Sequence, residues 1–195
     1  MKLAAIFFSM ILVNNYVLVK FLGICPFLGV SKRLDSATGM SAVVTLVMVI
    51  ATLVTWPLQQ VLERFSITYL QTIVFILVIA TLVQLLELLV KKFLPPLYVS
   101  LGVYLPLVTT NCAVLGVTIL NIDEGYTFAE SIICAVGSGL GFMLAMVMFA
   151  GVRRIVENAK PPKSFDGLPI TLVSAAIVAL AFTGFGGLVE NIFGI

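Results

Sequence analysis

Several residue types that commonly carry chemistry are scarce or absent in this sequence. Its 195 residues include no histidine, only three cysteines and a charged fraction of just 10%. The lack of histidine removes the commonest metal ligand and the usual proton shuttle near neutral pH. Three cysteines are too few for a disulfide framework, and all three lie in apolar stretches, so we expect no structural disulfide. The sequence also has no nucleotide-binding loop, nucleophile–base pair or carboxylate cluster, so we expect no complete active site in this chain.

The scarcity of charge also identifies the solvent of the protein. A soluble domain contains about one quarter charged residues, whereas hydrophobic residues make up 61% of this chain. Too little polar sequence remains to cover a surface that faces water. We therefore expect an all-α integral membrane protein that is surrounded by lipid and has no nucleic-acid partner.

The apolar segments have the lengths of membrane spans. A bilayer core of about 30 Å needs roughly 20 helical residues, and five segments have this length: 40–60, 69–90, 97–120, 128–151 and 168–189. A sixth apolar region runs from Leu3 to Val30 but contains polar residues, glycine and proline. We interpret it as one spanning helix that is broken near Gly23–Pro26. The sequence thus predicts six transmembrane helices in a single membrane domain, residues 1–195.

The distribution of basic residues predicts the orientation. Alternate loops contain eight of the eleven basic residues: Lys32, Arg33, Lys91, Lys92, Arg153, Arg154, Lys160 and Lys163. The positive-inside rule places these loops in the cytoplasm. With six spans, both termini are then expected on the outer side.

An internal repeat links the two halves of the chain. Cys25 and Cys112 each begin a Cys-x-x-Leu-Gly-Val segment, and they lie 87 residues apart (112 minus 25). We predict repeats at about 1–92 and 93–195. Three spans in each half would make the repeats inverted, because the second copy then enters from the opposite face. Inverted repeats usually place their site near the midplane, on broken helices, so we expect Cys25 and Cys112 to meet there.

The second cysteine segment also has the features of a broken helix. Pro106 and the polar run Thr109, Thr110 and Asn111 precede Cys112, which predicts that the fourth helix is broken as well as the first. Non-helical backbone inside a bilayer needs polar partners. We therefore consider Thr109, Thr110 and Asn111 as support for Cys112.

The matched cysteines are the candidate metal ligands. Two thiolates are soft ligands that suit iron–sulfur clusters, zinc or Cu(I), but a cluster typically needs four cysteines. Either a second subunit supplies the other ligands, or the pair is a redox dithiol. Cys134 has no counterpart in the repeat and is interpreted as a small hydrophobic residue.

Three other polar residues occur in the first apolar region. Lys20 could balance the negative charge of a cluster, or it could extend toward the cytoplasmic interface. Asn14 and Asn15 could line an ion path, but a hydrogen bond between helices is the preferred interpretation.

The stretch from Val13 to Lys32 resembles the signature of the A-type membrane subunits of the Rnf electron-transport complex. Residues 105–117 resemble the second half of that signature, and the similarity extends to 95–98 and 128–131. A related family is the E-type subunits of the sodium-pumping NADH:quinone reductase. The resemblance covers nearly the whole chain.

The resemblance implies a specific role for the chain. Members of the family have six spans and pair with a homologous E-type subunit of opposite orientation, within a complex of further Rnf subunits. Each of the two homologous subunits contributes two cysteines to a shared [2Fe–2S] cluster, and the matching positions here are Cys25 and Cys112. The complex is a translocase of the bacterial inner membrane that couples electron flow between ferredoxin and NAD⁺ to Na⁺ or H⁺ transport.

Two rival functions remain open at this point. One is a small-solute or ion transporter with inverted repeats and incidental cysteines. The other is a purely structural scaffold, in which both cysteines would tolerate replacement. Which ion is coupled, and whether this chain conducts it, is open as well.

Overall fold

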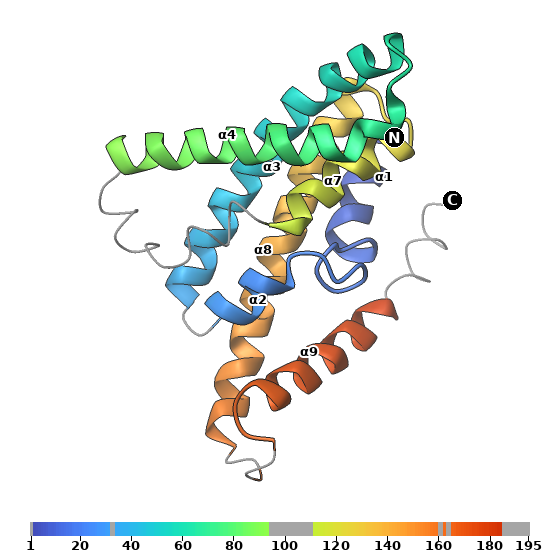
Figure 1. Ribbon diagram of the computed structural model, residues 1–195. Helices are drawn as coiled ribbons and strands as arrows, with labels where there is room; N and C mark the ends of the chain where they lie inside the picture. Colours follow the sequence, from blue (N-terminus) through green and yellow to red (C-terminus); the bar gives the residue numbers. More distant parts are fainter. Residues whose placement is uncertain (1, 32–33, 94–110, 160–161, 163–164, 185–195) are drawn as a thin grey trace.

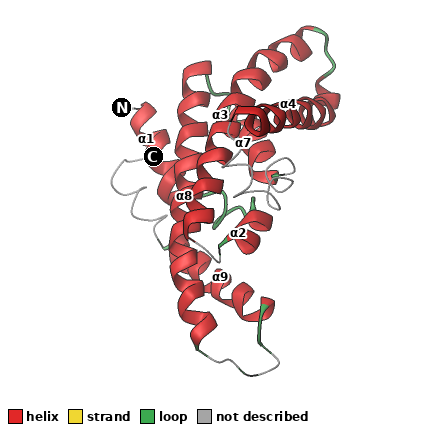
Figure 2. Cartoon of the chain, turned by 90° about the vertical axis from the view of Figure 1, so that its left-hand side faces the viewer, coloured by secondary structure: helices red, strands yellow, loops and turns green. Residues whose placement is uncertain are grey.

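The computed structural model describes residues 2–31, 34–93, 111–159, 162 and 165–184. All regular structure in these residues is helical, which confirms the all-α prediction (Figure 2). The elements are α1 (Lys2–Phe8), the π-helix η1 (Ser9–Val13), α2 (Ile24–Val30), α3 (Leu34–Arg64), the 3₁₀ helix η2 (Thr68–Leu70), α4 (Gln71–Phe93), α7 (Cys112–Asp123), α8 (Phe128–Asn158) and α9 (Leu168–Thr183).

Three of these helices are long and apolar enough to cross a membrane. They are Ser36–Arg64, Thr68–Leu88 and Phe128–Val156, and they match the predicted spans 40–60, 69–90 and 128–151. Shorter apolar helices cover Leu3–Val13, Cys112–Asp123 and Leu168–Thr183. Most of the predicted span 97–120 and the end of 168–189 lie outside the described residues. The coarse prediction of a multi-helix membrane protein therefore agrees with the structure.

The two longest helices, α3 and α8, form the centre of the molecule (Figure 1). They can approach closely because the residue of α8 that faces Thr45 is a glycine. A Cβ at Gly139 would lie 2.4 Å from Cγ2 of Thr45. Small residues serve the same purpose in other membrane bundles, where close van der Waals packing drives association. Helices α1 and α7 and the π-helix η1 also pack on α8, so α8 connects the elements around the cysteines.

The hydroxyl groups of α3 are satisfied inside their own helix. Ser41, Thr52 and Thr55 are buried, and each donates to the carbonyl oxygen four residues earlier at 2.7–2.9 Å. Lipid offers no alternative partner, so this bonding lets polar residues occupy an apolar span.

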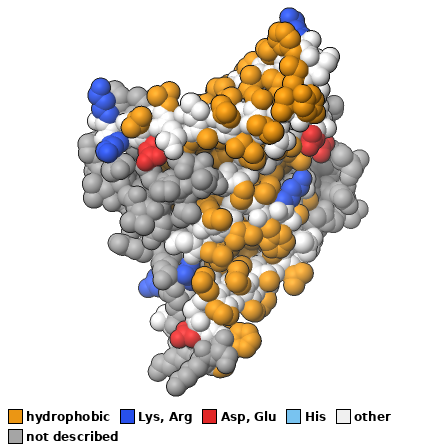
Figure 3. Space-filling view, in the orientation of Figure 1, with side chains coloured by type: hydrophobic (Ala, Val, Ile, Leu, Met, Phe, Trp, Pro, Cys, Tyr) orange, Lys and Arg blue, Asp and Glu red, His pale blue; other side chains and the backbone are white. Residues whose placement is uncertain are grey.

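The outer helices expose their apolar side chains. On α4 these include Ile73, Ile76, Leu77, Leu85 and Leu88. On α9 they include Leu168, Leu172, Ile177 and Leu180. Hydrophobic side chains also cover much of the face in Figure 3, where charged side chains are few. Such surfaces suit lipid or neighbouring membrane helices.

Three predicted boundaries need correction. The break in the first apolar region is longer and begins earlier than Gly23–Pro26, since η1 ends at Val13 and α2 begins at Ile24. Pro26 lies within the first turn of α2, where a missing N–H group removes no helical bond. Arg153 and Arg154 do not lie in a loop, because α8 continues to Asn158, and Lys91 and Lys92 lie in the last turn of α4.

Candidate functional site

The segment between η1 and α2 is shaped by Asn15. Its Oδ1 accepts a hydrogen bond from the N–H of Val17 at 3.1 Å, and its Nδ2 donates to the carbonyl oxygen of Gly141 at 2.7 Å. The Gly141 position has no room for a side chain, because a Cβ there would lie 2.9 Å from the carbonyl oxygen of Met10. The side chain of Asn15 thus pairs with backbone groups outside a helix. These hydrogen bonds stabilise non-helical backbone inside the apolar region.

The same segment ends in two residues with positive φ. Phe21 has φ 55° and is exposed, whereas Gly23 has φ 84° and is buried. A Cβ at Gly23 would lie 2.9 Å from Cε2 of Phe142 and 3.2 Å from Cβ of Ala113. Both the backbone conformation and the packing therefore require glycine at this position.

Cys25 follows directly, as the second residue of α2. Its thiol is exposed. The helix is only seven residues long and has no side-chain cap at its N-terminus. Next to Cys25 and Pro26, the ring of Phe27 is buried and stacks on Phe149 of α8, with a centroid distance of 4.2 Å.

Cys112 is the first residue of α7, and its thiol is also exposed. Asn111 precedes it in an extended conformation, and the Asn111 side chain accepts a hydrogen bond from the N–H of Ala113 at 3.0 Å. This is a standard N-cap, which satisfies one of the free N–H groups at the start of a helix. The structure thus begins a new helix at the cysteine.

One hydrogen bond joins the two cysteine segments. The N–H of Gly23, two residues before Cys25, donates to Sγ of Cys112 at 2.9 Å. The contact connects residues that are 89 positions apart in the chain. It brings the two matched segments into direct contact.

The third cysteine, Cys134, differs from the other two in being buried. Cys134 has no exposed surface, and its sulfur lies 4.0 Å from Oγ of Ser138, one turn along α8. Within the described ranges, no group of three or more histidine, cysteine or acidic side chains could hold a metal ion. Cys25 and Cys112 are free and exposed, and two thiols are half of the four-cysteine set that a cluster typically needs.

As donors, these two thiols would fit two of the ligand positions of an iron–sulfur cluster. Both thiols are accessible, and the N–H of Gly23 donates to one sulfur. Hydrogen bonds to sulfur are among the features that set the potential of such clusters. Cys112 also lies at the positive end of the α7 dipole, which stabilises negative charge.

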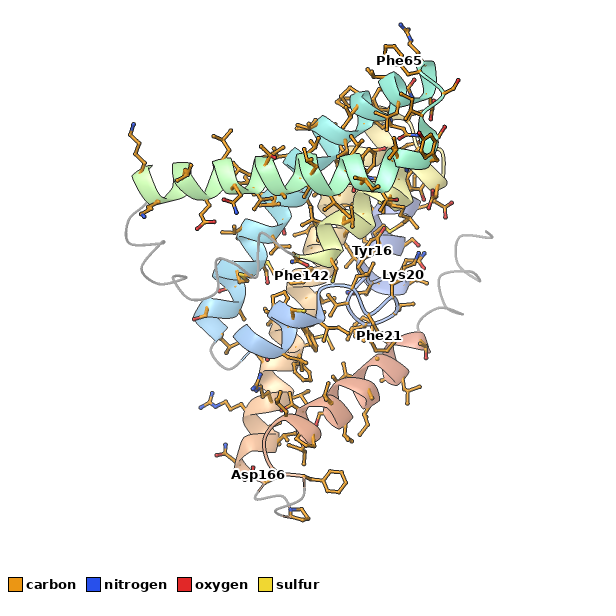
Figure 4. All side chains as sticks on the ribbon, in the orientation of Figure 1. Tyr16, Lys20, Phe21, Phe65, Phe142 and Asp166 are labelled. Carbon is orange, nitrogen blue, oxygen red and sulfur yellow. The ribbon has the colours of Figure 1, made fainter. Side chains whose placement is uncertain are left out.

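The remaining polar candidates from the sequence are Lys20, Thr109, Thr110 and Asn14. Lys20 is exposed beside Tyr16, with Nζ 5.9 Å from the ring centroid, and lies next to Phe21 on the same segment (Figure 4). Thr109 and Thr110 lie outside the described residues. Asn14 donates to Oγ of Ser9 at 3.2 Å.

Sequence reasoning missed one residue near the site. Arg153 is only 7% exposed and donates from Nη1 to the carbonyl oxygen of Leu28 and, at 2.8 Å, to Oγ of Ser31. In the sequence it is one of two adjacent arginines at the end of an apolar span. The pair signals a membrane boundary, but nothing in it distinguishes the buried arginine from the exposed Arg154.

Comparisons with known proteins agree with these features. The family described as "Rnf-Nqr subunit, membrane protein" matches residues 3–189. The A-type subunit of the ion-translocating oxidoreductase complex of Syntrophotalea carbinolica is 54% identical over 97% of this chain and 99% of its own length. The A-type subunit of the Na⁺-translocating ferredoxin:NAD⁺ oxidoreductase complex of Acetobacterium woodii is 54% identical over 96% of this chain and 98% of its own length. The corresponding Proteus mirabilis protein is 49% identical over 95% and 96%.

Proposed function

The chain belongs to the Rnf-Nqr family of membrane subunits, and from this premise we propose that it is an electron-transfer subunit of an ion-translocating ferredoxin:NAD⁺ oxidoreductase complex. Relatives that match it over nearly their whole length have names that describe this activity. Cys25 and Cys112 are proposed as two of the four ligands of a [2Fe–2S] cluster. A homologous subunit, of the E type, supplies the other two.

The observation that carries this proposal is the contact between Gly23 and Cys112. It joins the backbone two residues before one exposed thiol to the sulfur of the other, across distant parts of the chain. Structural cysteines in a membrane bundle are normally buried, as Cys134 is. Two accessible thiols that find no further ligand among the described residues are the arrangement expected of a site shared between two subunits.

When bound, such a cluster would supply a one-electron carrier inside the membrane. The residues of this chain determine its surroundings. The N–H of Gly23 donates to the sulfur of Cys112, and the Asn111 cap keeps Cys112 at the first position of its helix. Lys20, exposed a few residues before Cys25, adds a positive charge to the same segment.

The proposal includes two inverted three-helix repeats and six spans. Both halves begin their cysteine helix after non-helical backbone and continue into a helix of 31 residues, α3 in one half and α8 in the other. These two helices pack against each other, as the equivalent elements of two related halves would. The basic loops then face the cytoplasm and both termini face outward, in a bacterial inner membrane.

The test replaces each cysteine by serine in the purified complex. Cys25→Ser and Cys112→Ser should each abolish the electron paramagnetic resonance signal of one [2Fe–2S] cluster and remove about two iron atoms per complex. Cys134→Ser is the matched control and should retain both the signal and the iron. A cluster that survived both ligand replacements would overturn the proposal. A complex without iron that still transported ions would instead support a transporter with incidental cysteines.

A further inference from the structure

Helix α2 needs anchors from outside itself. It has seven residues, fewer than an isolated helix needs for stability, and its N-cap, Gly23, offers no side chain to satisfy the first N–H groups. The chain immediately before it is irregular. The direction of α2, and with it the position of Cys25, therefore depends on contacts with neighbouring elements.

Arg153 of α8 provides such a contact at the far end of α2. Its guanidinium group donates to the carbonyl oxygen of Leu28, inside the last turn, and to Oγ of Ser31, the C-cap residue. Ser31 has no exposed surface. Carbonyl groups at the end of a helix have no partner within the helix. A positive charge there also interacts favourably with the negative end of the helix dipole.

A second contact lies one turn earlier on α8. Phe149, four residues before Arg153, stacks on Phe27. Residues four apart in a helix share one face, so the same face of α8 holds both the side of α2 and its end. Two anchors along one line fix the tilt of α2 as well as its distance from α8.

Cys112 is held in a different way. Its helix starts at a side-chain cap from Asn111, the adjacent residue, and its sulfur accepts the N–H of Gly23. Arg153 makes neither contact, although Gly23 is the N-cap of the helix that Arg153 binds at its other end. Loss of Arg153 should therefore disturb one cysteine much more than the other.

We propose that Arg153 is a positioning residue for Cys25: by binding the C-terminal end of α2, it sets the direction in which the Cys25 thiol faces a shared metal site. This rests on the proposed function for the role of Cys25 as a ligand. The hold of Arg153 on α2 is a separate statement about this chain and can be tested by itself.

The first experiment uses the purified complex with Arg153→Gln, Arg153→Lys and the control Arg154→Gln. Arg154 is the next residue on α8 and is exposed, so its replacement removes the same charge without touching α2. We expect Arg153→Gln to shift the midpoint potential and the g values of the cluster. It should also speed the loss of iron to a chelator by about tenfold, the lower end of the effect of changing a residue that supports a metal ligand. Arg153→Lys should recover part of each value, and Arg154→Gln should match the unmodified complex.

Ser31→Ala provides a milder version of the change. It removes one acceptor of Arg153 and leaves the charge in place, so it remains informative if Arg153→Gln prevents assembly. We expect a smaller shift of the potential in the same direction. The proposal would be overturned if Arg153→Gln had the same midpoint potential and rate of iron loss as Arg154→Gln. If Arg153→Gln does not assemble, the same comparison is made with Ser31→Ala.

The second experiment does not depend on a cluster. A membrane-permeant maleimide is reacted with Cys25 in a complex carrying Cys112→Ser and Cys134→Ser, and with Cys112 in one carrying Cys25→Ser and Cys134→Ser. Arg153→Gln should change the labelling rate of Cys25 severalfold and that of Cys112 by a much smaller factor. Equal changes at both cysteines would overturn the positioning role. Absence of a cluster signal in the unmodified complex would overturn the proposed function alone.

Discussion

The two cysteine segments have the same local sequence pattern but are held in place by different means. Cys112 starts a helix of 12 residues whose cap is the preceding residue. Cys25 lies on a helix of seven residues that follows an irregular segment, and its anchors come from α8, more than 120 positions further along the chain. One ligand is positioned locally, and the other is positioned by tertiary contacts.

This difference has a consequence for how the site can respond to change. A locally capped helix keeps its first residue in place as long as the cap is intact. A short helix held from a distance moves whenever its anchors or the segment before it move. We therefore expect Cys25 to be the more sensitive ligand, and Gly23, which contacts both segments, to be the most sensitive position of all.

The largest effect is expected from Gly23→Ala. Positive φ disfavours alanine by about 1–2 kcal/mol, and the clash with Phe142 adds about 1–3 kcal/mol of overpacking. The thermal unfolding midpoint of the purified complex should fall accordingly. Gly125→Ala is the matched control, since Gly125 has φ 63° with nothing within 4 Å of the added Cβ. Equal losses for both variants would show that the packing around Gly23 carries no stability.

An intermediate effect is expected from Asn111→Ala. Loss of an N-cap side chain reduces helix stability by about 1 kcal/mol, and the loss should appear at Cys112. In the complexes in which this chain retains one cysteine, maleimide should label this chain faster at Cys112 and at an unchanged rate at Cys25. Asn111→Asp retains the cap acceptor and should behave as the unmodified chain. A faster rate at Cys25 as well would mean that the two segments are not held independently.

The smallest effect is expected from the aromatic pair of Phe27 and Phe149. A double-mutant cycle with leucine at each position should give a coupling free energy of about 0.5–1.5 kcal/mol, the usual value for a stacked pair. The midpoint of thermal unfolding provides the measurement for all four members of the cycle. Additive losses would leave Arg153 as the main anchor of α2 on α8.

The sequence predicted the helical class and six spans, three of which the structure shows as long apolar helices, because lipid permits few backbone structures. Every backbone polar group in the hydrocarbon region must be paired within the protein, and an apolar run of about 20 residues satisfies this as a helix. It also set Cys134 apart from Cys25 and Cys112, because only those two occur in the repeat. In the structure Cys134 is buried and the other two are exposed. The role of the exposed pair as ligands stays a prediction.

Other features could not be read from the pattern. The break before Cys25 was placed at Gly23 and Pro26, the residues that most often interrupt helices. Asn15 begins it earlier because its side chain finds a carbonyl group on α8, at a glycine that leaves room for it. A polar residue in an apolar run indicates that a partner exists but not where the partner lies.

By itself, the sequence determined the solvent of this protein, its helical class and the residues that can act as soft ligands, because composition and local periodicity are enough to specify these. Only the tertiary structure decided that Gly23 donates to Cys112 and that Arg153, rather than Arg154, holds the helix of Cys25. These facts depend on which faces of distant helices meet, and that is set by the packing of the whole bundle around α3 and α8.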